Sequence, residues 1–242
     1  MKNYKLILSY DGTDFHGWQR QPKKRTVQGT LEDSLTQITQ KKINITGAGR
    51  TDAGVHAQAQ VANFKAILSM EDDELFRALN SLLPQDVRVT SLERIDLDFH
   101  ARKMAKSKIY QYRIVNSTNI SPFIMRYVLH WPSALKVQPM REAAPLFIRE
   151  ADFTSFSSNR LLDPVRKVTR SELHKKRNEI IYTVEANGFL RYMVRTMAGT
   201  LLEVGKGKLL PEQIEALFRK KERSPASPTA PAKGLCLIKV NY

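Results

Sequence analysis

The stretch from Gly47 to Ala57, GAGRTDAGVHA, places one acidic and one basic residue among three glycines. Glycine leaves no side chain between the backbone and a ligand, and it adopts turn conformations at low cost. Backbone N–H groups and the nearby Arg50 favour the ionised form of Asp52, which then serves as a nucleophile, a base or a metal ligand. The alternative is an aspartate that only caps its own turn, the commoner role in glycine-rich loops.

The segments on either side of this loop predict a sheet covered by helices. Residues 4–10 and 58–64 alternate between apolar and polar residues as strands do, and residues 87–92 repeat the pattern. Residues 27–38, after the N-cap Thr26, have helical periodicity. A second helix is expected from a cap at Ser69 to the stop at Pro84. The order predicts an α+β layer with helices on one face of the sheet and Asp52 on a loop between strands.

The remaining segments predict a second unit of similar make-up. A helix is expected near residues 141–150, and paired strands over 165–173 and 180–185, joined by a basic turn at 174–179. The most apolar helix covers residues 189–202 and ends near Gly205. A last helix is expected to start at Leu210-Pro211, and a strand to cover residues 235–240. We therefore expect two domains, an N-terminal unit over residues 1–104 and a basic unit over residues 105–242.

Two tyrosines stand out on a predicted strand over residues 108–114. Tyr110 and Tyr112 fall on the same face as Lys108, because side chains two residues apart share a face of a strand. Half-buried strand packing is the commoner reason for such tyrosines. In a basic protein, the same arrangement also suits a platform on which nucleic-acid bases stack.

Composition limits the class of protein. The chain has 242 residues, of which 42% are hydrophobic, enough for a sizeable core. We expect neither a hydrophobic signal region nor a membrane span, because the first apolar run ends at Ser9. One cysteine, Cys236, allows no internal disulfide and no cysteine-rich metal site, so a reducing cytoplasm is the expected location.

The charge distribution favours a polyanionic partner. The net charge is +15, and the excess lies in the second part of the chain. Residues 1–100 hold 13 Lys/Arg and 13 Asp/Glu, whereas residues 101–242 hold 26 and 11. Nucleic acid is the expected partner, because binding of cations to phosphates releases condensed counterions. A basic surface that is merely solvated is the alternative.

Arg195 is placed beside the apolar stripe of the predicted helix over residues 189–202. Val194 and Met197 flank it, so its guanidinium lies at the edge of an apolar surface. A charge there needs a carboxylate partner, because an unpaired charge near a core is costly.

Several motifs, taken together and in order from residue 4 to residue 242, resemble the tRNA pseudouridine synthase A family. The most specific of them is the Asp52 block. They are YDGT (10–13), GWQ (17–19), VQG (27–29), GRTDAGVHA (49–57), FHAR (99–102), KIYQY (108–112), DFTSF (152–156), MVR (193–195) and APAKGL (230–235).

The resemblance implies an isomerase without a cofactor that converts uridine to pseudouridine at positions 38, 39 and 40 of the tRNA anticodon stem-loop. It also implies a homodimer and a pseudouridine synthase-like fold, in which two related α/β units with mainly antiparallel sheets join into one extended central sheet flanked by helices. By similarity, Asp52 is the nucleophile, Arg195 pairs with it, and Tyr110 stacks on the uracil and is a candidate to transfer a proton. Arg50 and Arg102, in two of the matched motifs, are the further substrate-binding candidates.

Two other functions remain open from the residues alone. A non-catalytic RNA-binding module would share the basic charge but would tolerate replacement of Asp52. A metal-dependent nuclease usually needs a cluster of carboxylates, and no second acidic residue lies within 18 residues of Asp52 on either side. The sequence therefore predicts activity that does not depend on a metal.

Overall fold

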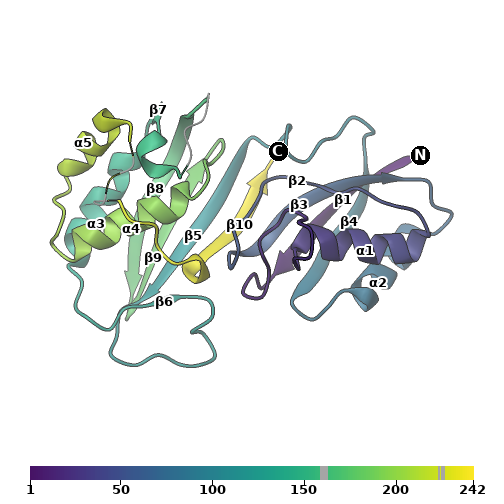
Figure 1. Ribbon diagram of the computed structural model, residues 1–242, viewed down its shortest axis with the longest axis horizontal. Coiled ribbons are helices and arrows are strands. Elements are labelled where there is room, and N and C mark those ends of the chain that lie inside the picture. The colour runs from purple at the N-terminus through teal and green to yellow at the C-terminus, as the bar shows by residue number, and fades with distance from the viewer. Residues whose placement is uncertain (159–162, 223, 225–226) are drawn as a thin grey trace. The chain divides into compact units, whose positions relative to one another are not determined.

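The computed structural model describes residues 1–158, 163–222, 224 and 227–242, and it divides the chain into two compact units. The first comprises Met1–Lys106 together with Leu237–Tyr242, and the second comprises Ser107–Cys236. Figure 1 labels their helices and strands. The predicted α+β class, with mainly antiparallel sheets and flanking helices, is confirmed.

The sheet of the first unit is built around β1 (Lys2–Tyr10), which pairs antiparallel with β3 (His56–Ala66) and β4 (Val87–Ile95). The short β2 (Thr46–Gly47) pairs with β3, and β10 (Leu235–Asn241) lies on the other side of β3 in the strand order. Period-two alternation in β1 buries Tyr4, Leu6, Leu8 and Tyr10. These side chains form the sheet side of the core.

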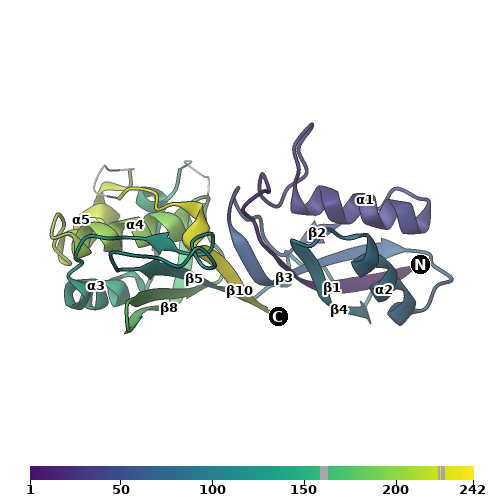
Figure 2. The ribbon, with the colours of Figure 1, turned by 90° about the horizontal axis from the view of Figure 1, so that it is seen from below.

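Two helices complete this core. Figure 2 shows α1 (Val27–Thr39) lying across the strands of the first unit, and α2 (Asp72–Leu82) contacts both α1 and β4. Fully buried leucines of both helices face the sheet, namely Leu31, Leu35, Leu75 and Leu79. The Thr26 hydroxyl caps α1 by accepting a hydrogen bond from the Gly29 N–H, as predicted.

The end of the chain closes the first unit. The Lys106 N–H donates to the Asn241 carbonyl (2.8 Å), and the Tyr242 hydroxyl donates to the Ala101 carbonyl (2.7 Å). The ring of Tyr242 also packs on that of Phe99, with centroids 5.1 Å apart. Residues 237–242 therefore hold the segment that follows β4.

In the second unit the strand order is β5-β9-β8-β7, and neighbouring strands are antiparallel. A short β6 pairs parallel to β5. The strands are β5 (Ser107–Val115), β6 (Leu129–His130), β7 (Glu150–Asp152), β8 (Val165–Lys176) and β9 (Glu179–Ala186). The predicted pairing of β8 with β9 is confirmed, and the strands extend further toward their turn than the sequence indicates because Arg177 adopts a left-handed conformation (φ 55°).

Three α-helices and three 3₁₀ turns belong to the described part of this unit. They are α3 (Val137–Ala143), η1 (Ala144–Phe147), η2 (Thr154–Phe156), α4 (Met193–Gly205), α5 (Gln213–Lys220) and η3 (Ala232–Gly234). Four phenylalanines pack ring against ring in the core, with centroids 5.0–6.2 Å apart: Phe147, Phe153, Phe156 and Phe218. The expected apolar character of α4 is confirmed, since Met193, Met197 and Leu201 are buried.

Several helix limits differ from the sequence prediction. The helix expected at 141–150 is α3 followed by a 3₁₀ turn, because Pro145 has no N–H with which to continue an α-helix. Helix α2 starts at Asp72 after Glu71 and not at Ser69. Pro211 precedes α5, because Leu210 and Gln213 bond to each other in a turn before the helix begins.

None of the helices in the described part of the chain combines the length and apolar content that crossing a bilayer requires.

Candidate active site

Asp52 lies in a tight turn between β2 and β3. The Val55 N–H donates to the Asp52 carbonyl (3.1 Å), and Gly54 has a φ of 78°, a conformation that glycine adopts without strain. The Asp52 side chain is half-buried, whereas the next residue, Ala53, is exposed. The turn therefore leaves Asp52 partly accessible, on a loop between two strands as the sequence predicts.

Contacts from two other segments fix this turn. The Trp18 N–H donates to the Thr51 carbonyl (3.0 Å), and the Gly54 N–H donates to the Phe15 carbonyl (3.3 Å). The hydroxyls of Tyr10 and Thr51 share a hydrogen bond of 2.8 Å. The residues on both sides of Asp52 are thus tied to the end of β1 and to the loop after it. Such preorganisation favours a reactive group, because little entropy is lost when substrate binds.

The Trp18 side chain packs beneath this loop. Its side chain is only 3% exposed, and a Cβ built on Gly47 would lie 2.5 Å from the indole ring. Only glycine permits this approach. The glycines of the Asp52 block therefore have separate roles, since Gly54 forms the turn and Gly47 admits the indole.

His56 is a residue of this site that the sequence analysis did not single out. The Gly12 N–H donates to His56 Nδ1 (3.1 Å), and the same nitrogen lies 3.2 Å from Asp11 Oδ1. His56 is buried at the first position of β3, four residues after Asp52. It joins the turn that follows β1 to the strand that follows the Asp52 turn. Only its place inside the glycine-rich block could have drawn attention to it.

The two further arginine candidates also belong to the first unit. Arg50 lies two residues before Asp52 in the same loop, and Arg102 follows the buried Phe99. Both are exposed. The Asn63 side chain fixes the backbone beside Arg102, because its Oδ1 accepts a hydrogen bond from the Ala101 N–H (2.9 Å).

Tyr110 and Tyr112 of β5 share a face, as predicted, but both are buried. Tyr110 is 6% exposed and packs edge-on against Phe189, with ring centroids 5.2 Å apart. The Tyr112 hydroxyl donates to the Pro231 carbonyl (2.8 Å). Burial raises the pKa of the Tyr112 phenol, and the charge of Arg195 offsets this only in part. Tyr112 is therefore a packing residue held in its neutral form.

Arg195 lies in the first turn of α4. Its Nε donates to the Ala230 carbonyl (2.8 Å), while the Ala230 N–H donates to the Arg195 carbonyl (3.0 Å). The guanidinium carbon lies 4.8 Å from the centroid of the Tyr192 ring, and that of Arg191 lies 4.9 Å from the same ring. Tyr192 has a φ of 64°, which explains why α4 begins after it and not at Phe189. These contacts orient the Arg195 side chain.

The first unit thus holds Asp52, Arg50 and Arg102, and the second holds Tyr110 and Arg195. In the first unit the contacts above fix the backbone around Asp52 and beside Arg102, and in the second unit they fix the side chains of Tyr110 and Arg195. The predicted pairing of Arg195 with Asp52 stays a prediction. Among the described residues, no group of three or more His, Cys, Asp or Glu side chains is arranged to hold a metal ion.

Comparison with known proteins gives one consistent family. The sequence profile of the tRNA pseudouridine synthase family matches residues 6–102 and 143–242. A tRNA pseudouridine synthase A of Thermodesulfovibrio yellowstonii is 46% identical over 254 residues, and those of Caldicellulosiruptor saccharolyticus and Lacticaseibacillus casei are each 41% identical over 244 and 247 residues. Each alignment covers all of both chains. With the Asp52 turn present and the relatives matching throughout, the chain belongs to the tRNA pseudouridine synthase family.

Proposed function

We propose that this protein isomerises uridine to pseudouridine at positions 38, 39 and 40 of the tRNA anticodon stem-loop, with Asp52 as the nucleophile. The observation that carries the proposal is the half-buried Asp52 in a preorganised turn of a chain that matches tRNA pseudouridine synthases A over its full length. The basic charge of the chain suits the same substrate.

The reaction sets the chemical demands on the site. The bond between uracil N1 and ribose C1′ breaks, a bond between C5 and C1′ forms, C5 loses its hydrogen as a proton, and N1 gains a proton. A nucleophile that adds and then leaves divides this exchange into easier steps. The Asp52 carboxylate supplies it, with ribose C1′ and uracil C6 as the two possible points of attack. A base in a stem must also be flipped out, which requires a grip on the strand.

Tritium release tests the proposal directly. The C5 hydrogen is expelled once in each turnover, so tRNA that carries C5-tritiated uridine should release tritium to water. Unlabelled tRNA should gain pseudouridine without a change of mass, and subsequent chemical labelling of pseudouridine should detect the product. An RNA-binding module would bind this tRNA without releasing tritium. A nuclease would shorten it.

We expect the activity to survive a chelator. The motivation is the lack of a suitable ligand cluster among the described residues. Tritium release from pre-folded tRNA should be the same with and without EDTA, once the effect of magnesium on the RNA is controlled with a polyamine. A strict requirement for a divalent ion on the enzyme would contradict this expectation and favour the nuclease.

The Tyr110→Phe variant separates stacking from proton transfer. Phenylalanine keeps the ring against Phe189 but removes the hydroxyl, so tRNA affinity should remain near that of the wild type. If the hydroxyl moves a proton, tritium release should slow by about 10²-fold or more. If the ring stacks on the uracil, Tyr110→Ala should weaken binding by about 1–3 kcal/mol, and it should also lower the free energy of unfolding because it removes a buried ring that packs against Phe189.

Tyr112→Phe is the matched control on the same strand. It removes a hydroxyl that bonds to the Pro231 carbonyl, so it should lower the free energy of unfolding by about 1 kcal/mol and leave tritium release unchanged. A Tyr110→Phe variant that releases tritium at the wild-type rate would make Tyr110 a stacking platform only.

The homodimer and the cytoplasmic location belong to the same proposal. Membership in the family supports both, and the single cysteine is in keeping with a reducing compartment. Sedimentation equilibrium over a range of protein concentrations tests the dimer, and a mass of one chain throughout would exclude it.

A further inference from the structure

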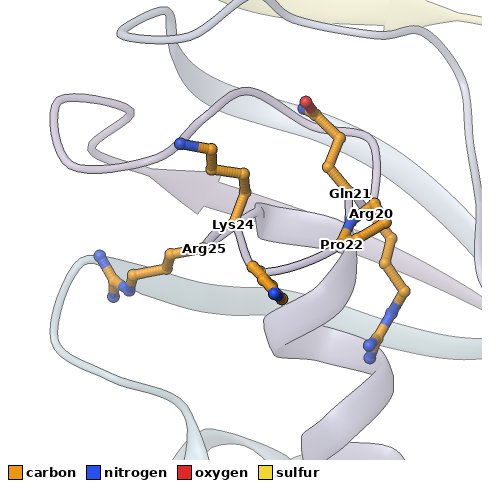
Figure 3. Close-up of a pocket in the computed structure, with 6 residues that line it drawn as sticks. Arg20, Gln21, Pro22, Lys24 and Arg25 are labelled. Carbon is orange, nitrogen blue, oxygen red and sulfur yellow. The ribbon is translucent and has the colours of Figure 1, made fainter.

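A basic hairpin, residues 20–25, stands apart from the residues assigned above. Its six side chains line a hollow of about 530 Å³ (Figure 3). Figure 2 shows the purple segment before α1 extending beyond that helix, on the side away from the strands. The sequence here, RQPKKR, contains four cations and no acidic residue.

Two of the four cations hold the hairpin in place. Arg20 Nε donates to Glu32 Oε2 (2.8 Å) on α1, and its Nη2 also bonds to Asp33. Arg25 forms a two-pronged pair with Asp86 (2.7 and 2.8 Å), and its guanidinium carbon lies 4.0 Å from the Phe15 ring centroid. Their charges are therefore neutralised within the first unit.

The other two cations remain available at the tip. Lys23 and Lys24 are exposed, and among the described residues no acidic side chain pairs with either. The turn is closed by the Lys24 N–H donating to the Gln21 carbonyl (3.3 Å), with Lys23 in a left-handed conformation. In Figure 3, Gln21 and Lys24 extend to one side of the loop, while Arg20 points to the other side. A closed turn presents the two ammonium groups with little backbone entropy left to lose.

The hairpin is connected to the Asp52 turn through its own base. The His16 N–H donates to the Arg25 carbonyl (2.9 Å), which closes the hairpin. Two residues close to His16 bond in turn to the Asp52 loop: the Trp18 N–H donates to the Thr51 carbonyl, and the Phe15 carbonyl accepts from the Gly54 N–H. A ligand held at the hairpin is therefore held by the same framework as the carboxylate.

We propose that Lys23 and Lys24 form a phosphate-binding surface that contacts the tRNA backbone and fixes it relative to the Asp52 turn. This inference rests on the proposed function, because it takes tRNA as the polyanion. Lysine suits the role, since its ammonium group binds phosphate as a point charge without the planar geometry that arginine imposes. Arg20 and Arg25 serve the surface indirectly by fixing the hairpin.

The test compares the double variant Lys23→Ala/Lys24→Ala with Lys41→Ala/Lys42→Ala. Lys41 and Lys42 are also adjacent and exposed, and they follow α1, whereas the hairpin precedes it. The two variants lose the same net charge. The probe is an unmodified tRNA transcript, and its dissociation constant is measured at several salt concentrations.

The hairpin variant should bind about tenfold more weakly at 0.1 M salt. The plot of log K for association against log[salt] has a negative slope, and this slope should become less steep by about 1.4–1.8, the value for two phosphate contacts. Its KM should rise more than its kcat falls. Lys23→Arg/Lys24→Arg should restore affinity. The Lys41/Lys42 variant should match the wild type.

Equal affinities for the two alanine variants would overturn the inference, because net charge alone would then account for binding. Wild-type protein that binds the transcript without releasing tritium would refute the proposed function. The affinities of the Lys23/Lys24 and Lys41/Lys42 variants would still test whether the hairpin binds RNA. Wild-type tritium release with an unaffected hairpin variant would refute the hairpin surface alone.

Discussion

The Asp52→Asn variant should bind tRNA with nearly wild-type affinity and release no measurable tritium. Asparagine keeps the shape of the side chain and the turn, which is held by backbone bonds of Asp52, Thr51 and Gly54. It removes the negative charge that makes the carboxylate a nucleophile. Loss of a nucleophile affects the chemical step and not the binding of substrate. Single-turnover tritium release with excess enzyme measures that step.

Asp98→Asn is a suitable control. Asp98 is exposed in the same unit, and its replacement removes the same charge. Both variants should unfold at similar denaturant concentrations, and only Asp52→Asn should be inactive. An Asp52→Asn rate above about a hundredth of the wild-type rate would exclude the nucleophile role, because other groups would then supply most of the catalysis.

The Arg195→Ala variant should lose both stability and activity. The change removes the charge-assisted hydrogen bond to the Ala230 carbonyl, worth about 1.5–3 kcal/mol. It also removes the contact with the Tyr192 ring, worth about 0.5–1 kcal/mol. The free energy of unfolding should fall by about 2–4 kcal/mol, as measured by urea denaturation. Tritium release at saturating tRNA should fall as well if Arg195 serves the carboxylate.

Two further substitutions separate these effects. Arg191→Ala removes an exposed guanidinium that contacts the same tyrosine ring and donates to its hydroxyl (3.2 Å), and because both contacts are exposed, the free energy of unfolding should fall by less than about 1 kcal/mol. Arg195→Lys keeps the charge but loses Nε, and it should therefore recover part of the activity with less of the stability. A stable and active Arg195→Ala variant would show that Arg195 has no part in the reaction.

The sequence predicts those helices and strands whose formation depends on residues only a few positions apart in the chain. The period of α1 and its Thr26 cap involve residues three or four apart, so the sequence alone reveals them. The alternation in β1 likewise follows from burial of one face. Asp52 was identified because turn chemistry and charge occur together in one short block.

Contacts between distant segments could not be predicted in this way. The Tyr10–Thr51 bond joins residues 41 apart in the chain, and the Gly12–His56 bond joins residues 44 apart. The predicted start of α4 is too early for a different reason, since the apolar pattern does not indicate the left-handed conformation of Tyr192, whose ring contacts the guanidinium groups of Arg191 and Arg195. Burial of Tyr110 against Phe189 also depends on the tertiary fold.

The membership of residues 237–242 in the first unit affects the order of events during synthesis. About 130 residues, the whole of the second unit, are translated between Lys106 and Leu237. The bonds from Lys106 to Asn241 and from Tyr242 to Ala101 can form only after that interval. Domains generally fold as units, in order from the N-terminus, while the chain is being made. Here the unit that carries Asp52 begins first and is completed last, so a ribosome that stalls within the second unit leaves the first unit without its closing strand.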